Sequence, residues 1–312
     1  QERNTQDYRK LESVIGDVVV MLAERQRSKI KYTGHRTGFH RLDEMTLGFQ
    51  PSDLIILAAR PSVGKTSFAM NVAVNIAAEG KKVAIFSLEM SAEQLAMRLL
   101  SSRGRIDAQK LKRGDVSGEE FTNAMLHLSS YDIYIDDTPG ISPLELRAKC
   151  RMLERRHGLD FVVVDYLQLM QGPNMRRTDS RVQEVSEISR ALKGIARELK
   201  VPVLALSQLS RGVENRQDKR PQLSDLRESG AIEQDADLVM FLWRKEDPGN
   251  YKGDTPANLD EFREHSEVVL MLAKHRNGPT GDIQMTFEKR YTSFAETLVG
   301  GGREVEFEDG FY

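Results

Sequence analysis

Short apolar runs alternate with segments of helical period along most of the chain. Several runs are apolar at every position, which is typical of strands buried on both faces and therefore of a parallel sheet covered by helices. The pattern predicts an α/β domain with a doubly wound, mostly parallel sheet. The predicted strands are residues 54–58, 83–87, 133–135, 161–164, 201–206, 238–242 and 268–273, and the predicted helices between them are 66–79, 92–101, 143–157 and 181–199.

Two further segments flank this domain. Over 8–22 apolar residues recur at spacings of three and four, which predicts a helix with one apolar face. The last residues combine a run of glycines with acidic side chains, which favours a mobile terminus. We therefore expect a linker helix within 1–32, the α/β domain over 33–295 and a flexible acidic tail over 296–312.

Composition limits the class of protein. With 312 residues, 39% apolar and 29% charged, the chain is long enough for one or two folded domains with a sizeable core. Its longest apolar runs are about six residues, far below the roughly 18 that cross a bilayer, so we expect no membrane span. A single cysteine, Cys150, excludes an internal disulfide and any Cys-rich metal site, and favours a reducing cytoplasm. The formal net charge of -2 does not by itself indicate nucleic-acid binding.

A phosphate-binding loop follows the first predicted strand. In a doubly wound sheet, ligands bind beyond the carboxyl ends of the strands. The sequence there, Ala59 to Thr66, matches the phosphate-loop pattern except that alanine replaces its first glycine. Gly64 permits a tight backbone, Lys65 supplies positive charge and Thr66 offers a magnesium ligand. The strand–loop–helix setting argues against a chance match. The candidate nucleotide-binding residues are Ser62, Val63, Gly64, Lys65, Thr66 and Ser67.

Polar residues also end three other predicted strands. Asp165 closes an apolar strand about a hundred residues after the phosphate loop, which suits a carboxylate that holds magnesium together with Thr66. Glu89 fits a general base that activates or orients the attacking water, although an acid capping the helix after Ser91 is the plainer alternative. Gln208 fits a sensor that hydrogen-bonds the γ-phosphate, or else a simple turn residue.

Two cations lie in a predicted hairpin turn after the last long strand. They are Lys274 and Arg276. Because the phosphate loop already has Lys65, extra cations suggest charge delivered to a neighbouring subunit's nucleotide, and such an arginine finger raises turnover by roughly 10³- to 10⁵-fold. An ordinary solvated turn is the alternative.

A local excess of positive charge falls between residues 171 and 230. This segment has twelve Lys or Arg against eight Asp or Glu, in a chain that is slightly negative overall. It includes two long polar loops, 172–180 and 210–230, without aromatic residues for base stacking. The loops suit either a groove that contacts the backbone of single-stranded nucleic acid or plain solvated loops.

Taken together, these strings resemble the DnaB-type replicative helicases over about residues 33–295. Alanine at the first phosphate-loop position is usual in that family, so the departure noted above supports the resemblance. The matching strings are Thr37-Gly38-Phe39, Ala59 to Thr66, Ser87-Leu88-Glu89-Met90, Asp165-Tyr166-Leu167-Gln168-Leu169-Met170, Ser207-Gln208-Leu209, Ser224 to Asp237 and Lys274 to Gly281.

The resemblance implies a RecA-like P-loop ATPase that uses ATP and Mg²⁺. It further implies a homohexameric ring that encircles single-stranded DNA, moves 5'-to-3' and unwinds duplex at the replication fork, with primase and a helicase loader as partners. Matched position by position, the implied roles are phosphate and magnesium binding for Lys65 and Thr66, magnesium binding for Asp165, catalysis for Glu89, γ-phosphate sensing for Gln208, contact with the neighbour's ATP for Lys274 and Arg276, and DNA binding for Arg227, Glu228 and Gly230.

The family usually carries an additional amino-terminal helical domain, which receives primase and is missing from this sequence. Since the sequence begins at Gln1, we expect the motor portion of a longer bacterial protein of the cytoplasm or nucleoid, or a naturally short phage or plasmid version. The helix at 8–22 would then be the linker that docks on the neighbouring subunit, or it packs on its own domain.

Three rival functions stay open at this point. A RecA-like DNA-dependent ATPase binds single-stranded DNA without unwinding it, and a clock-type relative only times a process. A small-molecule P-loop kinase needs a lid and an acceptor pocket, for which the sequence shows no insertion. A loader-dependent motor hydrolyses ATP but hardly unwinds. The strings around Arg227 to Asp237 and at Lys274 and Arg276 favour the helicase.

Overall fold

A single mixed sheet organises the α/β domain. The computed structural model describes residues 8, 10–28, 31–172, 181–216, 218–226, 230–244 and 265–297. Within that part of the chain the sheet has nine strands in the order β3-β2-β4-β5-β1-β6-β7-β8-β9. The first six strands of this order run parallel, and the last three pair antiparallel. The prediction of a mostly parallel, RecA-like sheet is confirmed.

The elements follow the predicted alternation closely. The strands are β1 (Leu54–Ala59), β2 (Val83–Ser87), β3 (Ile133–Asp136), β4 (Phe161–Asp165), β5 (Val203–Gln208), β6 (Leu238–Trp243), β7 (His265–His275), β8 (Gly281–Glu288) and β9 (Ser293–Glu296). The helices are α1 (Leu11–Ser28), α2 (His40–Thr46), α3 (Lys65–Ala78), α4 (Ala92–Gly104), α5 (Ala108–Arg113), α6 (Gly118–Ser129), α7 (Pro143–His157), α8 (Arg181–Leu199) and α9 (Gly230–Asp235), with short 3₁₀ turns η1 (Leu167–Leu169), η2 (Arg211–Asn215) and η3 (Leu223–Asp225).

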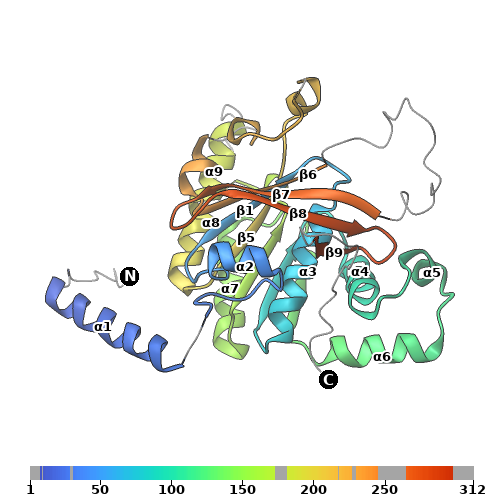
Figure 1. The fold of residues 1–312 in the computed structure, drawn as a ribbon, viewed down its shortest axis with the longest axis horizontal. Helices are drawn as coiled ribbons and strands as arrows, with labels where there is room; N and C mark the ends of the chain where they lie inside the picture. Colours follow the sequence, from blue (N-terminus) through green and yellow to red (C-terminus); the bar gives the residue numbers. More distant parts are fainter. Residues whose placement is uncertain are drawn as a thin grey trace.

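Helices cover both faces of the sheet, as the uniformly apolar strands require. Every residue of β1, β2 and β4 is buried. One face packs against α3 and α4 around Phe68 and Leu95, and the other packs against α7 and α8 around Leu146 and Leu192. Figure 1 shows these two helical layers on either side of the strands. The two cores fix the strand ends that carry the polar residues.

The structure differs from the sequence pattern at a few elements. β5 begins two residues later than predicted, because the Val201 N–H bonds to the Ala196 carbonyl at the end of α8, and Pro202 has no N–H to donate. α6 was not predicted, since Ala124 is its only buried residue and its apolar pattern faces solvent instead of a core. The predicted hairpin after the last long strand is present as β7 and β8.

α1 stands apart from the sheet domain in Figure 1. The helix is longer at its carboxyl end than the predicted 8–22, and its apolar residues are largely exposed. Throughout the described part of the chain, each helix is too short or too polar to traverse a bilayer. Of the predicted tail 296–312, only the first two residues belong to the described chain.

Candidate functional site

The phosphate loop joins β1 to α3 in a conformation that requires special backbone angles. Ser62 has φ +66° and Gly64 has φ +108°, both in the left-handed region that favours glycine. A Cβ on Gly64 would lie 2.8 Å from the ring of Phe294. Gly64 is also the N-cap of α3, so the free N–H groups of the first helical turn face the loop. This arrangement is a standard anion-binding geometry.

Three polar groups meet directly beneath this loop. The Thr66 hydroxyl donates a hydrogen bond of 2.7 Å to Asp165 Oδ2, and Lys65 Nζ lies 3.8 Å from Asp165 Oδ1. The Lys65 ammonium also lies 4.5 Å from the centre of the Tyr166 ring. Burial lowers the pKa of Lys65, while the nearby carboxylates of Asp165 and Glu89 act in the opposite direction. The sequence prediction that these residues converge is therefore consistent with the geometry.

The donor set beside the loop fits a magnesium ion. Asp165 is 1% exposed, and its Oδ1 has no hydrogen-bond partner among the described residues. Mg²⁺ prefers oxygen ligands and is usually held by one or two side chains together with substrate phosphates and water. The described residues contain no cluster of three or more His, Cys, Asp or Glu suited to a metal. Among them, Thr66 and Asp165 are the residues that would hold the ion.

Register across the sheet brings Glu89 and Gln208 to the same edge. Ser87 pairs with Asp165, which places Glu89 two residues beyond the end of β2. Ser91, not Glu89, caps α4, and it does so in a capping box with Gln94. The alternative of Glu89 as a helix cap is thereby excluded. Gln208 pairs with Ala59, so its side chain begins where the phosphate loop begins.

The remaining candidate nucleotide residues line the loop with different exposure. Ser62 is exposed, Val63 packs partly against the core, and Ser67 is buried in the first turn of α3. Arg60 anchors the loop from outside, since its guanidinium pairs with Glu214 at 2.7 Å and donates to the Leu209 carbonyl at 2.8 Å. Because the Ser67 side chain is buried, it is poorly placed for a ligand, and the Ser67 backbone N–H is the group available to an anion.

Lys274 and Arg276 lie at the opposite ends of the strands, on the side of the sheet where β1 and β6 begin; this side is the amino edge. Val239 pairs with Lys274 near the amino end of β6, and Arg276 Nη1 donates to Asp237 at 3.0 Å. Asp237 in turn accepts from the Leu54 N–H at the start of β1. The phosphate loop begins past the other end of β1, about 17 Å along the strand at 3.3 Å per residue. Both cations are therefore out of reach of the nucleotide loop of their own chain.

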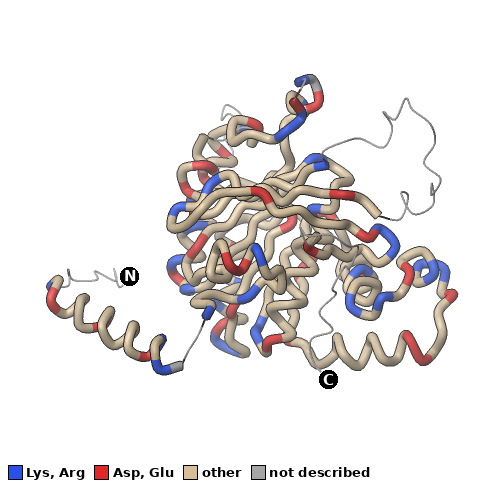
Figure 2. Tube along the Cα trace, in the orientation of Figure 1, with Lys and Arg blue, Asp and Glu red and all other residues tan. Residues whose placement is uncertain are grey.

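The candidate DNA contacts belong to the polar loop 210–230, which comes after β5. Arg227 and Glu228 lie outside the described residues, and Gly230 is the exposed first residue of α9. The described part of the segment, 210–216 and 218–226, projects from the sheet and contains both basic and acidic residues (Figure 2). Its fold is fixed by Asp225, which accepts from the Gln222 N–H at 2.7 Å and pairs with Arg216. The loop segment 173–180 is also outside the described residues.

Two residues near the nucleotide loop were missed by the sequence reasoning. Burial lowers the pKa of Arg98, and the charges of Asp165 and Glu89 act in the opposite direction, so the guanidinium interacts electrostatically with both carboxylates. Its position three residues after the buried Leu95 of α4 was the available signal, because such residues share a helix face. Gln168 was also missed. Its amide donates to Ser207 Oγ at 2.8 Å and holds the end of β5 in place.

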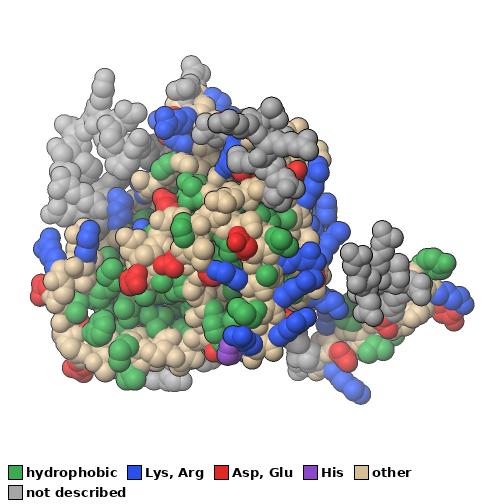
Figure 3. Space-filling view, turned by 180° about the vertical axis from the view of Figure 1, so that it is seen from behind, with side chains coloured by type: hydrophobic (Ala, Val, Ile, Leu, Met, Phe, Trp, Pro, Cys, Tyr) green, Lys and Arg blue, Asp and Glu red, His purple; other side chains and the backbone are tan. Residues whose placement is uncertain are grey.

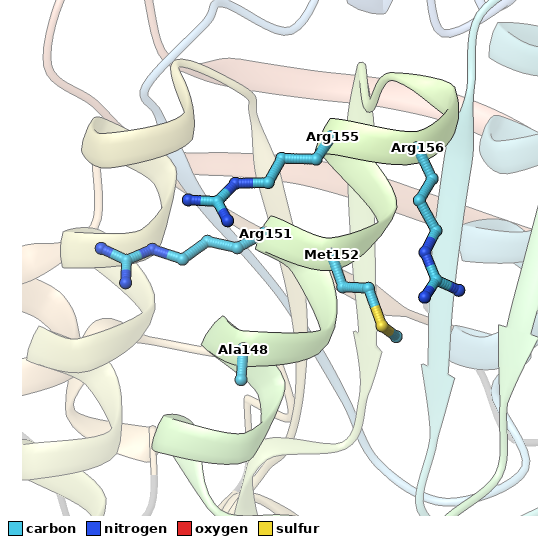
Figure 4. Close-up of a pocket in the computed structure, with 5 residues that line it drawn as sticks. All are labelled: Ala148, Arg151, Met152, Arg155 and Arg156. Atoms are coloured by element: carbon cyan, nitrogen blue, oxygen red, sulfur yellow. The ribbon is translucent and has the colours of Figure 1, made fainter.

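A groove on α7 does not belong to this site. It is lined by Ala148, Arg151, Met152, Arg155 and Arg156, whose side chains point outward from the helix in Figure 4. The groove lies toward the end of α7, just before β4 begins, and therefore at the edge of the sheet away from the nucleotide loop. Arg151 is engaged by Glu198 of α8.

Comparison with known proteins gives a consistent family. A family model described as DnaB-like helicase C terminal domain matches residues 34–296. The replicative DNA helicase DnaC of Bacillus subtilis (strain 168) is 52% identical over 299 residues, which are 94% of this chain and 63% of that protein. This chain thus spans less than two thirds of that relative.

Two solved structures agree in fold. One, described as an ATPase domain, is 40% identical with a TM-score of 0.80, covering 91% of this chain and 99% of that one. A DnaB-like replicative helicase, solved in a study of its interactions with primase, is 40% identical with a TM-score of 0.77, covering 89% of this chain and 65% of that one. The sheet order, the phosphate loop and these similarities together show that the chain belongs to the DnaB-like helicase C-terminal domain family.

Proposed function

We propose that the chain is the ATP-driven motor of a replicative DNA helicase, which works as a homohexameric ring on single-stranded DNA. The observation that carries this proposal is the division of the site between two edges of one sheet. Lys65, Thr66 and Asp165 lie at the carboxyl edge, and Arg276 lies at the amino edge. A complete site then needs a second copy, placed head to tail, and repeated head-to-tail contacts close into a ring.

In this proposal, each residue of the carboxyl edge has one task. The N–H groups at the start of α3 and the Lys65 ammonium bind the phosphates of ATP, and Thr66 and Asp165 hold Mg²⁺. When bound, the ion neutralises developing charge on the phosphates. Glu89, exposed beside this group, takes a proton from the attacking water. The amide of Gln208 hydrogen-bonds the γ-phosphate and reports its loss to the segment that follows β5.

Two cations act between copies. Lys274 and Arg276 of each chain supply positive charge to the phosphates of the ATP bound by the neighbouring copy, and Arg227, Glu228 and Gly230 contact the backbone of the DNA strand in the ring. Phosphate contacts without base stacking predict little sequence preference. Because the named relatives are replicative helicases, we also propose primase and a helicase loader as partners, and a bacterial cytoplasm or nucleoid as the location.

Two apolar surfaces support a linker role for residues 1–32. α1 exposes Leu11, Ile15, Val19 and Leu22 on one side of the helix. The other surface, formed by α4 and α6, is seen in Figure 3 as hydrophobic side chains gathered at the lower left. Its exposed residues are Met97, Phe121, Met125 and Leu126. Exposed apolar patches of this kind mark interaction sites, and in a ring α1 of one copy would cover the α4–α6 surface of the next.

A fork-unwinding assay tests the proposed activity. Forked DNA with a 5' tail on the loading strand should be unwound in the presence of ATP and Mg²⁺, and a fork with only a 3' tail should not. ATP hydrolysis stimulated by single-stranded DNA without unwinding of either fork would instead favour the alternative, a RecA-like ATPase that binds DNA without separating it. Turnover that is indifferent to DNA would contradict both.

Replacing Arg227 tests the DNA contact. Arg227→Ala should weaken binding to oligonucleotides of different sequence by a similar factor, because a phosphate contact carries no base information. The slope of log affinity against log salt should also become shallower by about 0.7 for one lost contact with single-stranded DNA. Fluorescence anisotropy at several salt concentrations measures both quantities. Arg113→Ala, on the exposed end of α5, is the matched control. A loss confined to one sequence would oppose the proposed contact.

A further inference from the structure

Lys274 and Arg276, the two finger cations, are bonded to the short helix that follows the DNA-contacting loop. This helix, α9, begins at Gly230, two residues after Glu228 in the sequence. Its carboxyl end leaves backbone carbonyls without helical partners and carries the negative end of the helix dipole. The Lys274 ammonium donates to the carbonyls of Glu233 and Ala236, the latter at 2.8 Å. Arg276 Nη2 donates to the Gln234 carbonyl at 3.4 Å.

Asp237 fixes this assembly to the core. It is 4% exposed and directly follows α9 and Ala236. Its Oδ1 accepts from Arg276 Nη1 at 3.0 Å, and the Arg276 N–H donates to the Asp237 carbonyl at 2.8 Å. Its Oδ2 accepts from the Leu54 N–H at 2.9 Å and pairs with Lys193 of α8. One carboxylate oxygen therefore faces the sheet and α8, and the other faces the finger.

Charge and packing make this a rigid unit. α9 packs on α8, with Ile232 fully buried between them. Burial and then the charge of Asp237 raise the pKa of the neighbouring Asp53 to about 6, while Lys193 and Arg276 act in the opposite direction. The half-buried Asp53, the buried Asp237 and the cations Lys193 and Arg276 thus face one another at the amino edge of the sheet. A hydrogen-bond network of this kind holds its members in one geometry when every bond is made.

We propose that Asp237 is the residue that positions Arg276, with the end of α9 as the support that holds both cations in place. Asp237 Oδ1 and the Asp237 carbonyl bind the guanidinium and the backbone N–H of Arg276, and the carbonyls at the end of α9 bind the side-chain nitrogens of Lys274 and Arg276. This inference rests on the proposed function. It adds a residue that acts on the neighbour's ATP only through Arg276.

Asp237→Asn tests the positioning role of Asp237. Loss of the carboxylate charge frees the Arg276 guanidinium, so the DNA-stimulated turnover should fall at least tenfold. The KM for ATP and the affinity for an oligo(dT) probe should stay within twofold, because neither binding site includes Asp237. Asp115→Asn, an exposed acid before α6, is the matched control and should leave all three quantities unchanged. Asp237→Glu keeps the negative charge but shifts the carboxylate, so it should give an intermediate rate. It replaces Asp237→Asn if the Asn variant has a lower unfolding temperature than the wild type.

Mixed rings separate a positioning role from a folding defect. Lys65→Ala chains lack a working site but keep intact fingers, so mixing them with Asp237→Asn chains should restore turnover at about a quarter of the interfaces in a random ring. Full DNA-stimulated turnover by Asp237→Asn alone, or a low rate that mixing does not restore, would overturn the positioning role of Asp237. The pairing of Arg276→Ala with Lys65→Ala is run in parallel. If neither mixture regains turnover, the proposed trans role of the fingers is wrong. If the Arg276→Ala mixture regains turnover and the Asp237→Asn mixture does not, only the inference about Asp237 is wrong.

Discussion

Arg276→Ala should bind ATP normally and hardly hydrolyse it. The proposed phosphate-binding groups lie at the carboxyl edge of the sheet, whereas Arg276 lies about 17 Å away along β1, next to Asp237. Binding by a chain's own loop therefore does not involve its own Arg276. Loss of an arginine finger costs roughly 10³- to 10⁵-fold in turnover, because its charge acts on the transition state.

Two measurements separate binding from turnover. Titration with a fluorescent ATP analogue should give a Kd within twofold of the wild type, and phosphate release in the presence of single-stranded DNA should fall to background. Arg155→Ala, on the exposed surface of α7, is the matched arginine control and should be active. If protein in which every subunit carries Arg276→Ala turned over ATP at the wild-type rate, the trans role would be wrong.

Lys65→Ala should lose turnover and nucleotide binding together. The Lys65 ammonium lies beside the buried Asp165, at the start of α3, where it balances both the carboxylate and an incoming phosphate. Removal takes away one of the positive charges beside Asp165 and the bound phosphates. A single lost charge-stabilising donor costs about 10²- to 10³-fold in rate, and weaker binding adds to that loss.

The two variants should differ in their affinity for the ATP analogue, so they are informative as a pair. Lys65→Ala should raise the Kd for the ATP analogue strongly, and Arg276→Ala should not change it. Lys110→Ala, in the exposed helix α5, controls for loss of a lysine elsewhere. Unchanged analogue binding and unchanged turnover in Lys65→Ala would show that the loop between β1 and α3 is not the nucleotide site.

The carboxyl edge of the sheet was predictable from the sequence for a simple reason. Parallel strands apolar at every position point their carboxyl ends to one edge, so the residues after β1, β2, β4 and β5 had to meet. The bond between Thr66 and Asp165 and the register of Ala59 with Gln208 follow this rule. The phosphate loop could be predicted because the positive φ of Gly64 is a local steric requirement that favours glycine.

The amino edge was not predictable in the same way. Arg276 reaches Asp237 only because β7 turns back antiparallel beside β6, with an irregular register between Val239 and Met240. Asp237 has no local pattern that marks it, since its partners Leu54 and Lys193 are far away in the sequence. Arg98 was missed for a similar reason, because the carboxylates that act on its pKa, Asp165 and Glu89, come from β4 and from the segment after β2. Contacts made by tertiary packing leave only weak signals in a single sequence.

The most direct test of a shared site measures ATP turnover per chain and particle mass on the same dilution series. Each chain has a mass of 35.3 kDa, so single chains and rings are well separated. If neighbouring copies complete one another's sites, turnover should appear with ring-sized particles, rise with single-stranded DNA and vanish as the particles dissociate to single chains. Particles with the mass of one chain that hydrolyse ATP at an undiminished rate, with no polynucleotide present, would contradict the account.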